Sequence, residues 1–234
     1  MAVVTWNPAD VSTGITLSNF NLDAKVGIAA GVYGVRATNP TSVGKWYFEA
    51  TPALITVSGI QAIGLANATW PLNFVSLGTD FNSIGYRPDG SVWENTGIVA
   101  TISSYLVNSI ISVAFDLTNN KIWFRVNGGN WNNDVLLSQN PATNTGGVDI
   151  SSLSGPFMAA WAGVTTNEIL ADFGFDFTYV APVGFAALGS GEPITRLSLD
   201  GYGAKRIKDF DGKVPSTPPS TGVTPWPLFE RMVA

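Results

Sequence analysis

Three tryptophans of this 234-residue chain, Trp70, Trp93 and Trp131, lie in or beside segments that the sequence predicts to be loops, near asparagine and aspartate. Exposed rings of this kind can stack on the apolar face of a sugar while amides and carboxylates bond its hydroxyl groups. The same residue types recur at the centre of protein–protein interfaces. A third interpretation is that the rings cover the ends of a β-structure. The candidate ligand- or partner-binding residues of this predicted loop surface are Trp70, Asn73, Tyr86, Trp93, Trp131, Asn132 and Asp134.

Trp131 follows a strong turn signal. Residues Lys121–Val126 alternate large apolar with polar or mixed side chains, which is typical of a strand. Asn127-Gly128-Gly129 then supplies residue types that accept a positive φ, and the combination predicts a tight hairpin. Trp131 and the asparagines after it should therefore lie just beyond a hairpin, as a lid or as a contact surface.

No catalytic residue is predicted. The chain has no cysteine and no histidine, which excludes thiol nucleophiles, Ser-His pairs and zinc sites built from those residues. Four acids in predicted loops offer carboxylates for glycoside cleavage, but nothing in the sequence brings two of them together. They are Asp80, Asp89, Glu94 and Asp134. We therefore expect a protein that is not an enzyme and uses no metal or cofactor.

Charge is scarce along the chain. Charged residues make up 12% of it and the formal net charge is −5, whereas soluble domains average roughly 25% charged residues. Nucleic-acid binding is not expected, because it needs a basic patch. Aromatic residues reach 12%, beside abundant asparagine, threonine, serine and glycine, and this composition favours an all-β protein.

Strand-like runs separated by turn signals support the same fold class. They predict an antiparallel β-sandwich, with strands near residues 43–51, 59–66, 110–117, 121–126, 156–164 and 169–179. Large aromatic side chains at alternating positions should fill the core between the sheets, namely Trp46, Phe48, Phe115, Phe124 and Phe173. Trp123 is out of phase with Phe124, so it is either a surface partner across strands or part of a second packed layer.

The character of the chain changes near Gly189. Residues 189–234 contain half of the lysines and arginines, and they include the Pro/Ser/Thr run PSTPPSTGVTP, which should be extended and stiff. We predict a β-sandwich domain over 1–188 and a linker with a docking tail over 189–234. The tail either packs on its own domain or docks on another subunit. We favour docking on another subunit. Its docking residues are predicted to be Trp226, Leu228, Phe229 and Met232.

Targeting signals are not evident. The N-terminus MAVVTWNPADVS has no basic region and no apolar run of signal-peptide length. No run approaches 18 consecutive apolar residues, so membrane insertion is not expected. Release from a cell would then need another route, such as assembly into a particle freed by lysis.

Several motifs, in order, resemble the SPRY family. The segment GKWYFE at residues 44–49 resembles the opening of the family's first core strand, and IGLA at residues 63–66 resembles a later one. Further likenesses run to about residue 185: SIGY with DG and VW over 83–93, ISVAFD with KIWFRVNG over 111–128, and FG with a phenylalanine over 173–177. Trp131, Asn132 and Asp134, followed by TGG at 145–147, are more similar to bacterial and bacteriophage members.

This resemblance, covering about residues 44–185, implies a concanavalin-like sandwich of two antiparallel sheets that binds partners through loops at one end. It implies binding rather than catalysis, and we transfer no contact residues from animal members. The first hypothesis is a bacteriophage virion protein, either a decoration or a tail-fibre protein. It would be assembled in the host cytoplasm, be oligomeric in the particle, and attach to capsid or tail proteins through its C-terminal tail. Its loops would face a host-surface glycan or protein.

A second hypothesis is a free-standing SPRY module that binds a glycan, as a lectin does, or a peptide. Such a module would bind its ligand equally well without the C-terminal tail. The sequence leaves both hypotheses open.

Overall fold

The computed structural model describes residues 3–27, 30–56, 60–174 and 176–189. The chain divides into two units, and every described residue belongs to the first of them, Met1–Ile194.

The predicted docking tail lies outside the described residues. Its four residues Trp226, Leu228, Phe229 and Met232 belong to the second unit, Thr195–Ala234. Their role and the predicted domain limits at residue 188 stay predictions.

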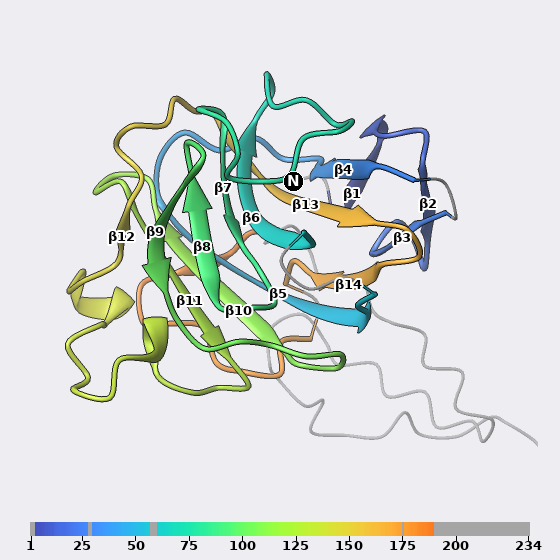
Figure 1. Cartoon of the computed structure of the whole chain (residues 1–234). Helices are drawn as coiled ribbons and strands as arrows, with labels where there is room; N and C mark the ends of the chain where they lie inside the picture. The colour runs from blue at the N-terminus through green and yellow to red at the C-terminus, as the bar shows by residue number, and fades with distance from the viewer. Residues whose placement is uncertain (1–2, 28–29, 57–59, 175, 190–234) are drawn as a thin grey trace, which may run out of the picture. The chain divides into compact units, whose positions relative to one another are not determined.

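Two antiparallel sheets form the first unit (Figure 1). In sheet A the strand order is β1 (Trp6–Val11), β4 (Val32–Ala37), β13 (Phe157–Val164), β6 (Ala62–Asn67), β7 (Ser83–Tyr86), β8 (Ser91–Glu94) and β9 (Gly97–Thr101). In sheet B it is β12 (Val148–Asp149), β11 (Lys121–Val126), β10 (Ile111–Asp116), β5 (Lys45–Leu54), β14 (Glu168–Asp172), β3 (Asp23–Val26) and β2 (Ile15–Ser18). A short parallel strand, β15 (Ala186–Ala187), pairs with the start of β5. The predicted all-β sandwich is confirmed.

Helices contribute little to the described residues. They contain two short 3₁₀ helices, η1 (Trp131–Asn133) and η2 (Pro141–Thr143), both between β11 and β12. Within the same residues, no helix is long and apolar enough to cross a membrane.

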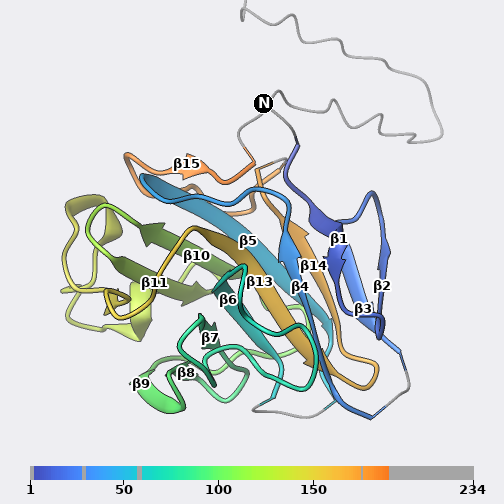
Figure 2. The same cartoon turned by 90° about the horizontal axis from the view of Figure 1, so that it is seen from above.

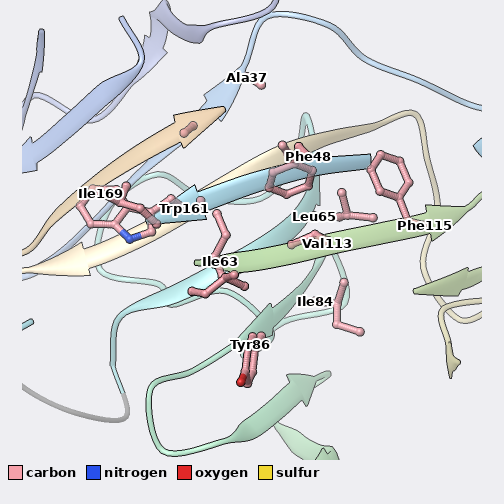
Figure 3. Close-up of a cluster of buried hydrophobic side chains, with 14 of the residues drawn as sticks. Ala37, Phe48, Ile63, Leu65, Ile84, Tyr86, Val113, Phe115, Trp161 and Ile169 are labelled. Carbon is pink, nitrogen blue, oxygen red and sulfur yellow. The ribbon is translucent and has the colours of Figure 1, made fainter. Parts of the chain in front are cut away.

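The main core fills the space between the facing sides of the two sheets, as the layers in Figure 2 and the close-up in Figure 3 show. Phe48 and Phe115 from sheet B meet Ile63 and Trp161 from sheet A, and all four are fully buried. The predicted core residues Phe124 and Phe173 are also buried there, and Trp46 is partly buried against the same cluster.

Strands β10 and β11 form the hairpin that positions the candidate site. They pair in register from Asp116 opposite Lys121 to Ile111 opposite Val126. The buried Asp116 carboxylate closes the turn by accepting the amides of Thr118 and Asn119 at 3.0 and 3.1 Å.

The second turn differs from the prediction. Asn127 and Gly128 have the expected positive φ values of 50° and 68°. However, the strand that pairs with the far edge of β11 is β12, which begins only at Val148, so no tight hairpin forms at residues 127–129. The chain instead enters η1 and a long connection before it returns.

Both sheets carry a second packed layer on their outer faces. On sheet B, Trp123 is fully buried with Tyr47 and Ala114, and Phe185 from the segment before β15 covers them. Of the two interpretations of Trp123, the second packed layer is therefore the correct one.

The outer face of sheet A is covered by the connection between β6 and β7. Alanines of β6 and β13 face outward beneath this segment, and Trp70 and Leu77 pack on them. Small side chains on the strands allow a large ring to lie close to the sheet. The alanines are Ala62, Ala66, Ala160 and Ala162.

Candidate functional site

The first predicted site residue, Trp70, is not on the surface. Its side chain is 1% exposed, and its ring packs over Gly34 of β4. The Trp70 carbonyl accepts a 2.5 Å hydrogen bond from Arg36, whose guanidinium is itself paired with Asp10. Trp70 therefore covers the sheet, as the lid interpretation requires. Nearby Asn73 is exposed, but its carboxamide oxygen accepts a 2.5 Å bond from the Ser12 hydroxyl.

Tyr86 also belongs to the interior. It is fully buried against Tyr105 and Phe124, with ring centroids 5.0 and 5.1 Å away, and its hydroxyl donates to the Ser103 carbonyl. Burial raises the pKa of this hydroxyl, and the charge of Asp89 raises it further. The exposed loop surface predicted for Tyr86 and Trp70 is thus wrong for both side chains.

Trp131 and Asn132 lie together where η1 packs on β11. The Trp131 ring is half-buried beneath the Arg125 guanidinium, 4.4 Å from the ring centroid. Asn132 accepts the Phe124 amide at 2.9 Å and donates to Gln139 at 3.0 Å. These two residues therefore fix the β11–β12 connection to the sheet, and the side-chain amide of Asn132 is already engaged.

Asp134 organises an apolar tip in the same connection. Its carboxylate accepts the Leu136 amide at 3.0 Å and the Ser138 hydroxyl at 2.6 Å, and these hydrogen bonds, with that of Ser138 the stronger influence, lower its pKa. Val135, Leu136 and Leu137, which lie between Asp134 and Ser138 in the sequence, are 80%, 83% and 70% exposed. Asp134 thus presents three consecutive apolar side chains to solvent.

A groove of about 430 Å³ lies at the open edge of the sandwich, where the edge strands β9 of sheet A and β12 of sheet B approach each other (Figure 1). One wall consists of residues 99–102, and the other of Asn132, Gln139 and residues 147–149. We call this feature the open-edge groove. A smaller hollow that shares Ile102 continues it toward Tyr86 and Asn133.

The groove wall formed by β9 is an apolar, uncharged strand edge. Ile98 and Val99 are 57% and 47% exposed, and among the described strands β9 pairs only with β8. Ala100 lies opposite Val92 and Ile98 opposite Trp93, so Val99 forms a bulge between them. Natural edge strands usually carry charge or proline against unwanted pairing. This edge has neither, which is typical of a contact surface.

Trp93 lies on β8, next to the strand β9 that forms one wall of the groove, and does not itself line the groove. Its ring is half-buried under the guanidinium of Arg87, 4.0 Å from the ring centroid, and its indole N–H donates to the Ser91 hydroxyl at 2.7 Å. Arg87 therefore holds one face of the ring, and the hydrogen bond to Ser91 holds its indole N–H edge.

The four acids considered for catalysis bind separate partners. Asp80 accepts from Ser83, Asp89 from Ser91, Glu94 from Ser152 and Asp134 from Ser138. Burial raises the pKa of Glu94, the hydrogen bond from Ser152 opposes this, and the charge of Asp149 adds to it. Within the described residues, no group of three or more acids could hold a metal ion.

Of the predicted residues, Asn132 alone lines the open-edge groove. Trp131 and Asp134 lie in the same connection, Trp93 lies across β9, and Trp70 and Asn73 belong to the cover of sheet A. Sequence reasoning missed residues 99–102. The uncharged run GIVATI at 97–102 contains the β-branched residues that mark a strand, and it was the available signal.

Comparisons with known proteins identify the fold. No family model matches the chain, and no curated protein matches it. Among solved structures, the SPRY domain of human HERC1 is 14% identical, with a TM-score of 0.58 over 75% of this chain and 99% of that one. The TRIM65 PSpry domain is 12% identical, with a TM-score of 0.55 over 73% and 92% of the two chains. A human SPRY domain is 18% identical, with a TM-score of 0.53 over 70% and 98%.

At such identities a structural likeness establishes the fold alone. The two antiparallel sheets and the coverage of nearly whole SPRY domains agree with the motifs in the sequence. The described part of this chain is a SPRY-like β-sandwich.

Proposed function

We propose that this SPRY-like domain is a non-enzymatic binding module that docks an extended protein segment in the open-edge groove. The observation that carries the proposal is the groove itself, about 430 Å³ beside an apolar and uncharged strand edge. An unpaired strand edge offers main-chain hydrogen bonds to an added strand, and neighbouring pockets select its side chains.

A protein partner suits the groove better than a glycan does. Sugar recognition needs a free aromatic face and free amides. The Trp131 ring is covered by Arg125, while Asn132 and Gln139 are engaged with each other and with the Phe124 and Gly147 amides. The exposed apolar side chains of this region are Ile98, Val99 and the tip at Val135, Leu136 and Leu137.

The proposal is tested by selecting peptides from a random display library on the wild-type domain and measuring their affinity for variants. Val99→Arg places a charge in the groove wall, and we expect it to weaken the selected peptides at least ~10-fold, about 1.4 kcal/mol. Val183→Arg is the matched control, because Val183 is 83% exposed and lies outside the groove. Equal binding to both variants, or selection of no peptide, would contradict the proposal.

We further propose that the domain is displayed on a bacteriophage particle as a decoration or fibre protein. This role is supported by the sequence alone: the motifs similar to bacteriophage SPRY members, the low charge, and the Pro-rich segment that leads to an apolar terminus. The tail would contact capsid or tail proteins through Trp226, Leu228, Phe229 and Met232, and the groove would face outward.

Co-sedimentation with particles in a lysate of the source tests the display role. We compare the full chain, a version ending at Leu188, and a full-length Trp226→Ala/Phe229→Ala variant. Loss of co-sedimentation in both altered proteins is expected. If the full chain itself stays unassociated, the display role fails, and a free-standing module becomes the better account.

A further inference from the structure

One basic residue of the described part of the chain, Arg87, is unlike the rest. It is 8% exposed, and its side chain makes no hydrogen bond or ion pair with another described residue; its Nε atom is buried without a partner. The other five described lysines and arginines are each engaged: Lys25 with Glu168, Arg36 with Asp10, Lys45 with Asp116, Lys121 with the Asn144 carbonyl, and Arg125 with the Val180 carbonyl.

The fold holds this guanidinium in a defined position. Arg87 directly follows β7, and its backbone amide bonds the Ser91 carbonyl at 2.9 Å to close the turn into β8. Its guanidinium lies 4.0 Å from the Trp93 ring centroid, and the Trp93 indole is fixed by its 2.7 Å bond to Ser91. When one face of a guanidinium is stacked on a ring, its N–H groups point outward in the plane of the group.

A second stacked pair in the same domain provides an internal comparison. Arg125 lies 4.4 Å from the Trp131 centroid, but its Nη2 atom donates to the Val180 carbonyl at 3.1 Å. Both guanidinium groups lie over an indole ring and both Nε atoms are buried without a partner, but only Arg125 donates a hydrogen bond to a chain acceptor. In the Arg87–Trp93 pair the guanidinium lies over the ring, but no acceptor of the described chain binds it.

The surrounding negative charge limits the anion that this guanidinium can accept to one of low charge. The nearby acid is Asp89, whose carboxylate is occupied by the Ser91 amide at 2.9 Å and hydroxyl at 2.6 Å and forms no ion pair with Arg87. The Coulomb interaction with Asp89 nevertheless opposes a multiply charged ligand, as does the net charge of −5. A planar carboxylate carries one negative charge and matches the guanidinium fork in geometry.

We propose that the Arg87–Trp93 pair receives a carboxylate from the docking partner, supplied by an aspartate or glutamate side chain. This inference rests on the proposed binding function and names one chemical group of the partner. Ile98 lies opposite Trp93 in the β8–β9 register and directly precedes the groove residue Val99. The pair is therefore one strand away from β9, the strand that forms one wall of the groove.

The test uses the full chain and NMR titration at constant ionic strength with sodium acetate, sodium phosphate and sodium chloride as probes. Acetate is expected to give saturable shifts, in the millimolar range, at the Arg87 Nε–H and Trp93 Nε1–H signals. The Arg125 and Trp131 signals are the internal control and should not respond. Chloride and phosphate should produce less than a third of the acetate shift at equal concentration.

Two variants separate recognition from general electrostatics. Arg87→Lys keeps the charge but loses the planar fork, so we expect at least a fivefold weaker acetate response at Trp93. Arg125→Lys should leave that response unchanged. The proposal is overturned if wild-type protein shows no saturable acetate shift, if phosphate or chloride acts as strongly as acetate, or if Arg87→Lys responds like wild type.

These outcomes are independent of the groove experiment. A saturable acetate response at Arg87, together with peptide affinities that Val99→Arg does not change, would support the carboxylate site and contradict docking in the groove. Peptide affinities that Val99→Arg weakens, without any acetate response at Arg87, would support docking in the groove and contradict the carboxylate site.

Discussion

Trp131 illustrates how a residue that suggests a ligand can have a local task. Its ring lies under Arg125 and borders the outer layer formed by Tyr47 and Trp123 on sheet B. The asparagine after it fixes the β11–β12 connection through the Phe124 amide. The tryptophan and asparagine cluster beyond β11 therefore holds a long connection in place, and that connection forms one wall of the open-edge groove.

We predict that Trp131→Ala destabilises the domain by ~2 kcal/mol, less than a fully buried aromatic would cost, because Trp131 is only partly buried. The measurement is the free energy of unfolding in urea. Phe20→Ala is the control, since Phe20 is 90% exposed, and it should change stability by less than ~0.5 kcal/mol. Equal effects of the two substitutions would contradict this account of Trp131.

Tyr47 makes stability depend on alkaline pH. Burial, and then its 2.6 Å hydrogen bond to Glu49, raise the pKa of Tyr47 from 10.0 to about 12. A raised folded-state pKa contributes stability that is fully present below the ordinary value and is lost as pH rises through the folded value. Tyr47→Phe should therefore be less stable than wild type at pH 9, with the gap narrowing at pH 11. Urea unfolding at both pH values measures the difference in free energy of unfolding between the two proteins. A difference that is the same at pH 9 and pH 11 would contradict the prediction.

At the scale of elements, the strands with strong alternation were predictable. The expected strand at residues 121–126 matches β11, and the one at 110–117 matches β10 to within a residue at each end. Strands β1 to β4 were missed, since segments such as WNPADV in β1 contain proline and aspartate and lack a clean period of two. The predicted strand at 169–179 ends at Asp172, because Gly174 turns the chain at a φ of 138°.

The covers of the two sheets explain why the candidate site was only partly predictable. Strand β13, FMAAWAGV, is apolar on both faces, and such a run indicates a strand that is buried on both sides. That signal predicts a second layer on sheet A, and Trp70 is part of this layer. Trp123 belongs to the corresponding outer layer of sheet B. Which loop covers which face depends on contacts distant in sequence, and a periodicity argument does not reach them.

Gly34 tests the packing of the cover on sheet A. A Cβ at this position would lie 2.3 Å from the Trp70 ring, so Gly34→Ala should displace the ring and cost ~2 kcal/mol. Near-ultraviolet circular dichroism should change together with the urea midpoint. Gly97→Ala is the matched control in an edge strand, where the nearest atom is the Glu94 carbonyl oxygen at 3.7 Å. A Gly34→Ala protein with wild-type stability and spectrum would disprove this close packing.

For the molecule as a whole, the sandwich has covers on both outer faces and an open edge between β9 and β12. The covers bury Trp70 and Trp123, so the two large sheet faces offer little free surface there. The open edge retains the groove, and the connection that forms one of its walls carries the apolar tip held by Asp134. From these features of the described residues we propose that the binding surface lies at this edge of the sandwich.

The most direct test of this account is hydrogen–deuterium exchange of the full chain with and without a peptide selected on it. We predict that the peptide slows exchange in residues 97–103 and 132–149, with little change in residues 68–82, which cover sheet A. Slower exchange in 68–82, with 97–103 and 132–149 unchanged, would place the binding surface on that cover and contradict the open-edge groove.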